Sequence, residues 1–368
     1  MATTFIDKKA KLDELATRLS SCGAIALDTE FLWERTYYPQ LGLVQIADDS
    51  GECWLVDPVT IGDISPLAPI LESESIVKVL HDAGQDLMIL ARATGATPKN
   101  TFDTRLGAGF AGLVSTLSLQ KLVAEMTGVE LPKDETRSNW VARPLRPQQL
   151  KYAADDVAYL LTLREKIIEK CADDEVRSWL AEEMPRRAVP SDTLDRDPRE
   201  SWRRVSRFGA LLPRSQAVLC EISAWREECA REHNVPRARW VSDEALFEIA
   251  RVMPRDGGTL MSIRGVPQTW ARDRRAATVI GLVLKGMEAP LDAFQRHHEP
   301  SAIDRDTLKK LVSEMRADIE KRAVARLIDP AIVASRAEVE SYILARETGR
   351  DISWHPFLNG WRKTLLGL

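Results

Sequence analysis

The stretch that decides the fold runs from residue 24 to residue 47 and reads AIALDTEFLWERTYYPQLGLVQIA. It holds two short apolar runs, at residues 24–27 and 41–47, and a third run at residues 53–56 follows closely, as in an antiparallel meander. Asp28 and Glu30 come directly after the first run. Because residues i and i+2 of a strand point to the same face, both carboxylates are expected to project into one site.

The composition excludes several classes of protein. The chain has 368 residues, of which 44% are hydrophobic and 29% charged, so disordered and fibrous classes are ruled out. No apolar run is long enough to span a bilayer, and the start lacks the apolar core of a signal peptide. The five cysteines are scattered without any CxxC pair, which favours reduced thiols. We therefore expect a cytoplasmic protein with no membrane attachment.

The net charge of −4 at first argues against a nucleic-acid partner. Acidic residues outnumber basic ones in residues 1–180, however, whereas basic residues outnumber acidic ones in residues 181–368. Part of the acidic excess would belong to a metal site, whose bound ions would offset it. Whole-chain charge is therefore the wrong scale for this question.

The order of apolar patterns indicates an α/β region followed by helical regions. A fourth strand-like run at residues 76–80 is followed by helical patterns at residues 85–93, 105–113, 117–126 and 147–171. Almost everything beyond residue 208 has helical periodicity, at residues 215–233, 242–252, 268–286, 306–325 and 335–347. Prolines and charges around residues 184–207 and a weaker break near residues 288–307 predict connectors. We place the domains at residues 1–190, 209–290 and 296–368, with a linker at residues 191–208.

Two carboxylates side by side repel each other unless a cation lies between them. A D-x-E sequence alone is usually an ordinary polar strand end, but two further features favour a metal site. Asp86 lies just inside the helix after the fourth strand, and Tyr152 and Asp156 stand four apart, so they share one helix face. Four carboxylates are hard oxygen ligands suited to Mg²⁺ or Mn²⁺, and two such ions about 4 Å apart support phosphodiester hydrolysis. Tyr152 would orient the attacking water, since a phenol with a pKa of about 10 is a poor base near neutrality.

Neighbouring polar residues have plainer interpretations. Helical phase favours Asp156 over the adjacent Asp155, which is expected on a solvated face. Asp103 is expected to cap the helix that begins after it, and His81 to be a hydrogen-bonded structural histidine.

The motifs D-T-E-F, T-Y-Y-P-x-L-G-L-V-Q, H-x-A-x-x-D-L, F-D-T and Y-x-x-x-D-V resemble the tyrosine variant of the DEDD exonuclease superfamily. The closer resemblance is to bacterial ribonuclease D, and it is carried by residues 28–45, 138–145 and 149–161. It implies a ribonuclease H-like α/β catalytic domain with a mixed sheet flanked by helices. It also implies that Asp28 bridges two metals, that Glu30 and Asp156 serve the water-bearing metal, that Asp86 serves the other, and that Tyr152 positions the water.

Substrate contacts are more open. The resemblance suggests that Phe31 and Leu32 wedge the terminal base. Lys133 and Arg137 are candidates for phosphate contacts, and Trp140 either stacks on a base or anchors its segment in the core.

The helical second half resembles the HRDC domain, a small all-α module attached to ribonuclease D and to some helicases. We expect two such HRDC-like domains, the second more diverged. Their arginines either contact RNA phosphates or lie on a solvated helix face; the candidates are Arg237, Arg239, Arg272, Arg274 and Arg275.

The predicted function is a metal-dependent 3′→5′ exoribonuclease that releases 5′-mononucleotides. By resemblance, its substrates are the 3′ ends of tRNA precursors and other small structured RNAs, and no obligate protein partner is expected. Two alternatives stay open: a DNA-directed proofreading-type exonuclease, and a catalytically inactive RNA-binding protein.

Overall fold

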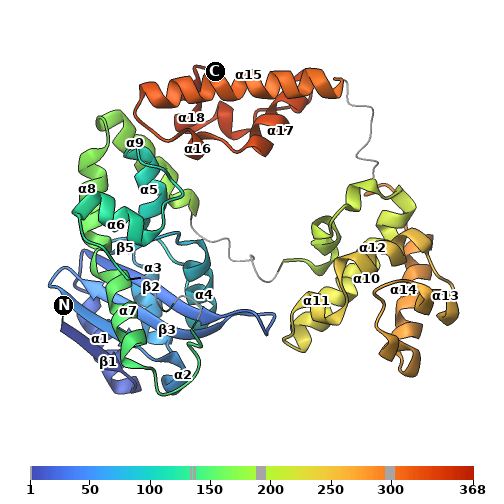
Figure 1. Ribbon diagram of the computed structural model, residues 1–368, viewed down its shortest axis with the longest axis horizontal. Coiled ribbons are helices and arrows are strands. Elements are labelled where there is room, and N and C mark those ends of the chain that lie inside the picture. Colours follow the sequence, from blue (N-terminus) through green and yellow to red (C-terminus); the bar gives the residue numbers. More distant parts are fainter. Residues whose placement is uncertain (1, 133–134, 136–137, 188–195, 295–302) are drawn as a thin grey trace. The chain divides into compact units, whose positions relative to one another are not determined.

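The computed structural model describes residues 2–132, 135, 138–187, 196–294 and 303–368. The chain separates into two compact units (Figure 1). The first contains Met1–Leu32, Leu41–Ser191 and Ser301–Leu368, and the second contains Trp33–Gln40 and Asp192–Pro300. The first unit therefore contains both the N-terminal and the C-terminal parts of the sequence.

The first unit is built on one six-stranded sheet. Its strands are β1 (Ala2–Ile6), β2 (Ala24–Leu32), β3 (Gln40–Asp48), β4 (Glu52–Val56), β5 (Val77–Leu80) and β6 (Thr101–Asp103). They lie in the order β1-β4-β3-β2-β5-β6. β1 pairs in parallel with β4, and β5 pairs in parallel with β2 and β6, whereas β3 and β4 are antiparallel. The predicted mixed sheet is confirmed.

The strands differ from the prediction at three places. β1 was not predicted, because most of it is exposed and it lacks apolar alternation. β6 was not predicted because it has only three residues. β2 does not end at residue 27 but continues to Leu32, so Asp28 and Glu30 lie inside the strand and not after it.

Alternate residues of β2 pack into two different cores. Ile25 and Leu27 belong to one buried cluster, whereas Ala26 belongs to the other. Since side chains alternate across a strand, the sheet is covered on both faces. Asp28 shares the face of Ala26, and this face carries the cluster that includes Tyr152.

Nine α-helices surround the sheet in residues 2–187 as far as these are described. They are α1 (Lys9–Leu19), α2 (Pro58–Ile61), α3 (Ala68–Glu72), α4 (Gly84–Thr94), α5 (Thr104–Phe110), α6 (Leu119–Thr127), α7 (Pro147–Ala158), α8 (Leu160–Lys170) and α9 (Asp174–Glu183). The single helix predicted over residues 147–171 is wrong, because Tyr159 ends α7 and begins a separate α8. Both helices contact β2.

The C-terminal helices belong to the first unit. They are α15 (Arg305–Ala325), α16 (Pro330–Val333), α17 (Arg336–Glu347) and α18 (Gly360–Leu366), and α15 lies along the other three (Figure 1). Their buried residues continue the cluster of α5, α8 and α9. A Cβ on Gly109 of α5 would lie 2.4 Å from Cγ2 of Ile332, so this glycine permits the close approach. The predicted second HRDC-like domain over residues 296–368 thus shares a buried core with the first unit.

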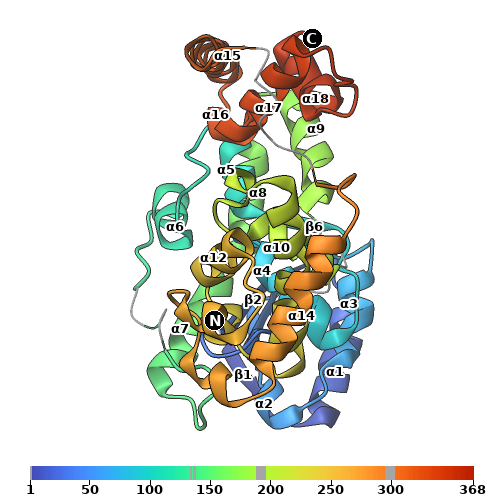
Figure 2. The ribbon, with the colours of Figure 1, turned by 90° about the vertical axis from the view of Figure 1, so that its right-hand side faces the viewer.

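The second unit is all-helical around its own core. It contains α10 (Pro213–Glu232), α11 (Arg237–Trp240), α12 (Asp243–Val252), α13 (Gly257–Ser262) and α14 (Arg275–Glu288), with α10 in contact with α12 and α14 (Figure 2). The helix predicted over residues 268–286 is interrupted, because η5 (Gln268–Arg272) ends before α14 begins. Part of the predicted linker is folded: η3 (Pro198–Arg204) buries Trp202 in the core. In the part of the chain described, no helix combines the length and the apolar character needed to cross a bilayer.

Candidate active site

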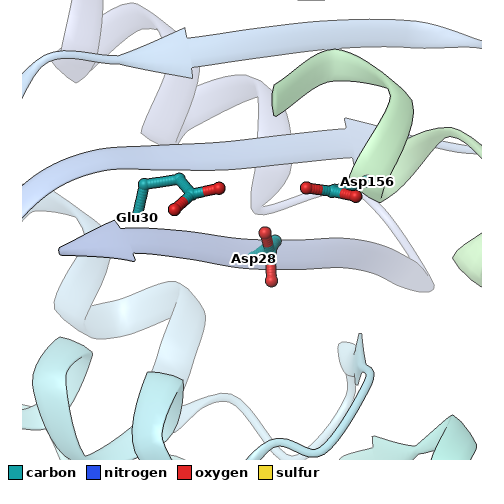
Figure 3. Close-up of side chains that lie close together, drawn as sticks. All are labelled: Asp28, Glu30 and Asp156. Carbon is teal, nitrogen blue, oxygen red and sulfur yellow. The ribbon is translucent and has the colours of Figure 1, made fainter. Parts of the chain in front are cut away.

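Three carboxylates from two elements meet at the centre of the first unit. One oxygen from each of Asp28, Glu30 and Asp156 lies within 4.8 Å of the others. Figure 3 shows the carboxylates of Glu30 and Asp156 turned toward each other, with Asp28 between them. Asp28 and Glu30 come from β2 and Asp156 from α7, as the i, i+2 and i, i+4 spacings predicted. The site is therefore assembled by strand–helix packing on one face of the sheet.

The helix phase of α7 separates two adjacent aspartates. Tyr152 and Asp156 are both buried, and the phenol donates a hydrogen bond to the Asp156 carboxylate, which holds down the pKa of that group. Asp155 instead pairs with Lys151 at 2.9 Å, one turn earlier on the outer face. The expectation that Asp155 lies on a solvated face is confirmed.

Asp86 lies in the first turn of α4 and is buried next to β2. The hydroxyl of Thr29 donates to its Oδ1 at 2.5 Å. Asp86 is not among the three carboxylates grouped above, but it lines the same pocket. Thr29, between the two acids of the D-x-E sequence, was not singled out from sequence, although its position there was a usable signal.

Asp103 organises the turn that leads to Asp86. Its carboxylate caps α5 by accepting from Arg105 N, which confirms the predicted cap. It also accepts from the backbone N–H groups of Asp82 and Ala83, where Asp82 has a φ of 58°. One carboxylate thus fixes both the start of α5 and the strained turn before α4.

The pKa values of the four acids in the site are all raised. Burial and the neighbouring carboxylates raise the pKa of Asp28 well above its ordinary value. Burial is also the largest cause that raises the pKa of Glu30 to about 9, of Asp156 to about 7 and of Asp86 to about 6. Clustered acids with raised pKa values are suited to a bound cation, which favours their charged forms.

The carboxylates line a pocket of about 640 Å³. The other lining residues come from β2, the turn before α4 and its first residues, the start of α5, the chain before and inside α6, and α7; they are Thr29, Phe31, His81, Asp82, Gly84, Gln85, Arg105, Thr116, Leu117, Ser118, Leu119, Gln120 and Tyr152. Phe31 lines this pocket and Leu32 does not, and the base contacts of both stay predictions. His81 is hydrogen-bonded as predicted: its Nε2 donates to the Leu117 carbonyl at 3.1 Å, and Nδ1 lies 2.9 Å from Thr104 Oγ1.

The other predicted substrate contacts fare differently. Lys133 and Arg137 lie outside the described residues. Trp140 is 1% exposed and packs beside Tyr152, so its ring offers no face to a base. Of the two interpretations left open for Trp140, the core anchor is correct and the stacking contact is wrong.

A brace that sequence reasoning missed holds Trp140 in place. A Cβ on Gly42 would lie 2.6 Å from the Trp140 carbonyl oxygen, so β3 needs glycine at this position. Arg143 donates to the carbonyls of Gly42 and Trp140 at 2.6 and 2.8 Å and pairs with the buried Asp57. Gly42 and Arg143 therefore have a structural role: they hold Trp140, which packs beside Tyr152.

Comparison with known proteins agrees with this geometry. A domain family described as 3′-5′ exonuclease matches residues 3–172, and the HRDC domain family matches residues 215–283. A ribonuclease D of Desulfotalea psychrophila is 38% identical over 361 residues, covering 96% of this chain and 94% of that protein. A ribonuclease D of Pseudomonas paraeruginosa is 34% identical and covers 93% and 90%. The chain belongs to the ribonuclease D family.

The crystal structure of ribonuclease D from Escherichia coli shares the architecture. It superimposes with a TM-score of 0.86 at 31% identity, covering 100% of this chain and 97% of that one, and is described as an exoribonuclease involved in structured RNA processing. The catalytic core of RRP6 from Trypanosoma brucei, at a TM-score of 0.61 and 23% identity, shows the fold alone. The predicted ribonuclease H-like domain followed by an HRDC domain is confirmed.

The candidate RNA-binding arginines of the HRDC domain divide into two sets. Arg237 pairs with the buried Glu227 at 3.3 Å, and Arg275 pairs with Asp273, so both have structural partners. The remaining three are exposed and stay predictions: Arg239, Arg272 and Arg274. The second HRDC-like domain also stays a prediction.

Proposed function

We propose that this protein is a metal-dependent 3′→5′ exoribonuclease that removes nucleotides one at a time and releases 5′-monophosphates. Membership of the ribonuclease D family and the converging carboxylates of Asp28, Glu30 and Asp156 support this proposal. We further propose that its substrates are the 3′ ends of tRNA precursors and other small structured RNAs. The description of the Escherichia coli relative, which processes structured RNA, is consistent with that substrate class.

The donor set fits two divalent ions of the Mg²⁺ or Mn²⁺ type. Carboxylate oxygens are hard ligands, and three of them already lie within 4.8 Å of one another. Burial, together with the neighbouring carboxylates, raises the pKa of Asp28, and a bound cation would offset both by favouring the charged form. In the proposed roles, Asp28, Glu30 and Asp156 would hold one ion, and Asp28 and Asp86 would hold the other. Such ions activate a water and stabilise charge on the phosphodiester.

The chain itself orients the reactants. Tyr152 donates its hydroxyl proton to Asp156, so its oxygen would accept a hydrogen bond from the attacking water and fix the direction of that water. Phe31, on the pocket wall beside the acids, would pack against the terminal base. Each residue acts by position, since neither side chain needs to ionise.

Cleavage of a 5′-labelled tRNA precursor in Mg²⁺ or Mn²⁺ tests the proposal. The wild type should give a ladder that shortens from the 3′ end, and Asp156→Ala should abolish it. Asp155→Ala is the matched control, because the neighbouring residue pairs with Lys151 outside the acidic cluster and should leave the ladder unchanged.

Three results would contradict the proposal. Internal cuts would exclude an exonuclease, and faster digestion of a matched DNA end would favour the proofreading-type alternative. A wild type as inert as Asp156→Ala with either metal would favour an RNA-binding protein.

Location in the cytoplasm and the lack of an obligate protein partner belong to the same proposal. The five free cysteines fit a reducing compartment.

A further inference from the structure

The candidate pocket is lined by both acidic and basic groups. Asp28, Glu30, Asp86 and Asp156 line it together with the chain between α5 and α6 and with Arg105. Among the described lining residues, Arg105 is the one guanidinium. An RNA end brings a phosphate with every nucleotide, so a cation in the same pocket would offset the repulsion between these phosphates and the acids.

Arg105 is held so that part of its guanidinium stays available. Its Nε donates to the Ser115 carbonyl at 2.9 Å, and its Nη1 pairs with Asp82. Among the described residues, its Nη2 has no hydrogen-bond partner. The Asp82 side chain is 63% exposed and that of Arg105 34%, and pairs so open to water add little stability. The guanidinium of Arg105 is thus held in one direction while its Nη2 keeps its hydrogen-bond donors. A planar guanidinium held in this way can donate to a phosphate.

The C-terminal helices fix the chain segment that directs Arg105. The backbone N–H of Ser115 donates to Asp329 Oδ2 at 2.6 Å, and Asp329 N donates to the Gly109 carbonyl at 2.8 Å. Asp329 also caps α16. A single carboxylate of the C-terminal region therefore holds the backbone of Ser115, whose carbonyl receives Arg105.

We propose that Arg105 binds a backbone phosphate of the RNA end in this pocket, and that Asp329 positions it through Ser115. The inference rests on the proposed function for the presence of RNA in the pocket. Arg105 is then a substrate-binding residue, and Asp329 is a positioning residue that acts from a helical region far along the sequence.

The first test measures binding of a single-stranded oligoribonucleotide by fluorescence anisotropy in EDTA, where no metal-dependent cleavage occurs. Arg105→Gln should weaken binding about tenfold. It should also lower the slope of log Kd against log salt by about 0.7, the value for one lost phosphate contact on a single strand. Arg105→Lys should keep the slope, because it keeps the charge, while binding less tightly than wild type.

Arg177→Gln is the matched control. Arg177 also pairs with one aspartate and one backbone carbonyl and is 38% exposed, but it lies on α9 and not in the pocket lining. It should leave both Kd and the salt slope at their wild-type values. Equal behaviour of Arg105→Gln and Arg177→Gln would overturn the inference, because a purely structural arginine would not change the salt slope.

The second test asks whether Asp329 acts through Arg105. Asp329→Ala should weaken RNA binding in the wild-type background but add nothing in the Arg105→Gln background. Ser335→Ala removes the N-cap of the neighbouring α17 and should cost similar stability without changing Kd. Equal weakening by Asp329→Ala in both backgrounds would exclude the positioning role.

Binding and cleavage separate this inference from the proposed function. A wild type that shortens RNA while Arg105→Gln binds normally refutes the inference alone. A wild type that binds RNA through Arg105 but never shortens it supports the inference and refutes the proposed function. A wild type that binds no RNA refutes both.

Discussion

Buried carboxylates occur in two regions of the first unit with opposite electrostatics. Glu183 of α9 accepts two hydrogen bonds from Arg362 at 2.7 and 2.9 Å and one from Trp361 Nε1 at 2.8 Å. These partners lower its pKa in spite of burial. Asp86 and Asp156 are about equally buried, yet their pKa values are raised. The difference teaches that Glu183 has its cation in the chain, whereas the pocket acids are arranged for a cation from outside.

The largest expected effect comes from neutralising the centre of the acidic cluster. Asp28→Asn keeps the shape of the side chain but removes the charge proposed to hold both ions, so activity should fall about 10³-fold or more. In EDTA the same variant should be at least as stable as wild type, since it relieves repulsion. Parallel measurements of RNA cleavage and denaturant unfolding check this. Retained activity would break the comparison, because the cluster would then not be a metal site.

Neutralising Glu183 is expected to destabilise the fold, which is the opposite of the result expected for Asp28. Glu183→Gln should lower the free energy of unfolding by about 3 kcal/mol, because it leaves the Arg362 guanidinium buried without a counterion. Asp174→Asn on the same helix is the control; it removes the partner of Arg177, but Asp174 is 98% exposed, so little change is expected. Denaturant unfolding of both variants checks this. Equal effects of the two variants would show that burial does not separate the two kinds of pair.

These two regions also differ in how far the sequence predicts them. The pocket acids follow from local geometry: Asp28 and Glu30 share a strand face, and Asp156 lies one turn past Tyr152. The pair of Glu183 and Arg362 joins residues far apart in the chain, and no period or motif connects them. Tertiary contacts of this kind also join the C-terminal helices to the core of the first unit.

The fold was predictable where one periodic signal covered one element. The mixed sheet and the helical second half met that condition. The helix breaks at Tyr159 and Asp273 were not predictable, because an apolar helical pattern continues across each of them. Trp140 could not be decided from sequence, since an aromatic beside basic residues suits either RNA or the core. The structure decides it by burying the Trp140 ring beside Tyr152.

A smaller effect is expected from the Tyr152 phenol, whose hydrogen bond partly offsets the raised pKa of Asp156. Tyr152→Phe removes the hydrogen bond that holds down the pKa of Asp156 and the group proposed to orient the water. The cleavage rate should fall about 30-fold, or about 2 kcal/mol, with the fold unchanged. Single-turnover kinetics at saturating RNA check this. A loss as complete as that of Asp28→Asn would mean that Tyr152 does more than position, and an unchanged rate would remove it from the site.

The smallest expected effect is a pH dependence of stability with opposite sign in the two regions. The folded pocket acids bind protons that the unfolded chain has released, since the pKa values of Asp86, Asp156 and Glu30 are about 6, 7 and 9. Their contribution to stability is therefore present at low pH and lost as pH rises through these values. In EDTA, the stability advantage of Asp28→Asn over wild type should grow by about 1 kcal/mol between about pH 5 and pH 8. Mg²⁺ should reverse it by stabilising the wild type.

Glu183 has the opposite sign, because its pKa is lowered in the folded protein. Its contribution is present above the ordinary glutamate pKa and is lost as pH falls through the folded value, so the destabilisation by Glu183→Gln should shrink in acid. Unfolding curves across the pH range for the wild type and both variants measure the two trends together. Trends of the same sign would contradict the comparison, because the two regions would then share one electrostatic design. Opposite trends, with only the pocket responding to Mg²⁺, would show that binding of an external cation distinguishes a metal site from a structural ion pair.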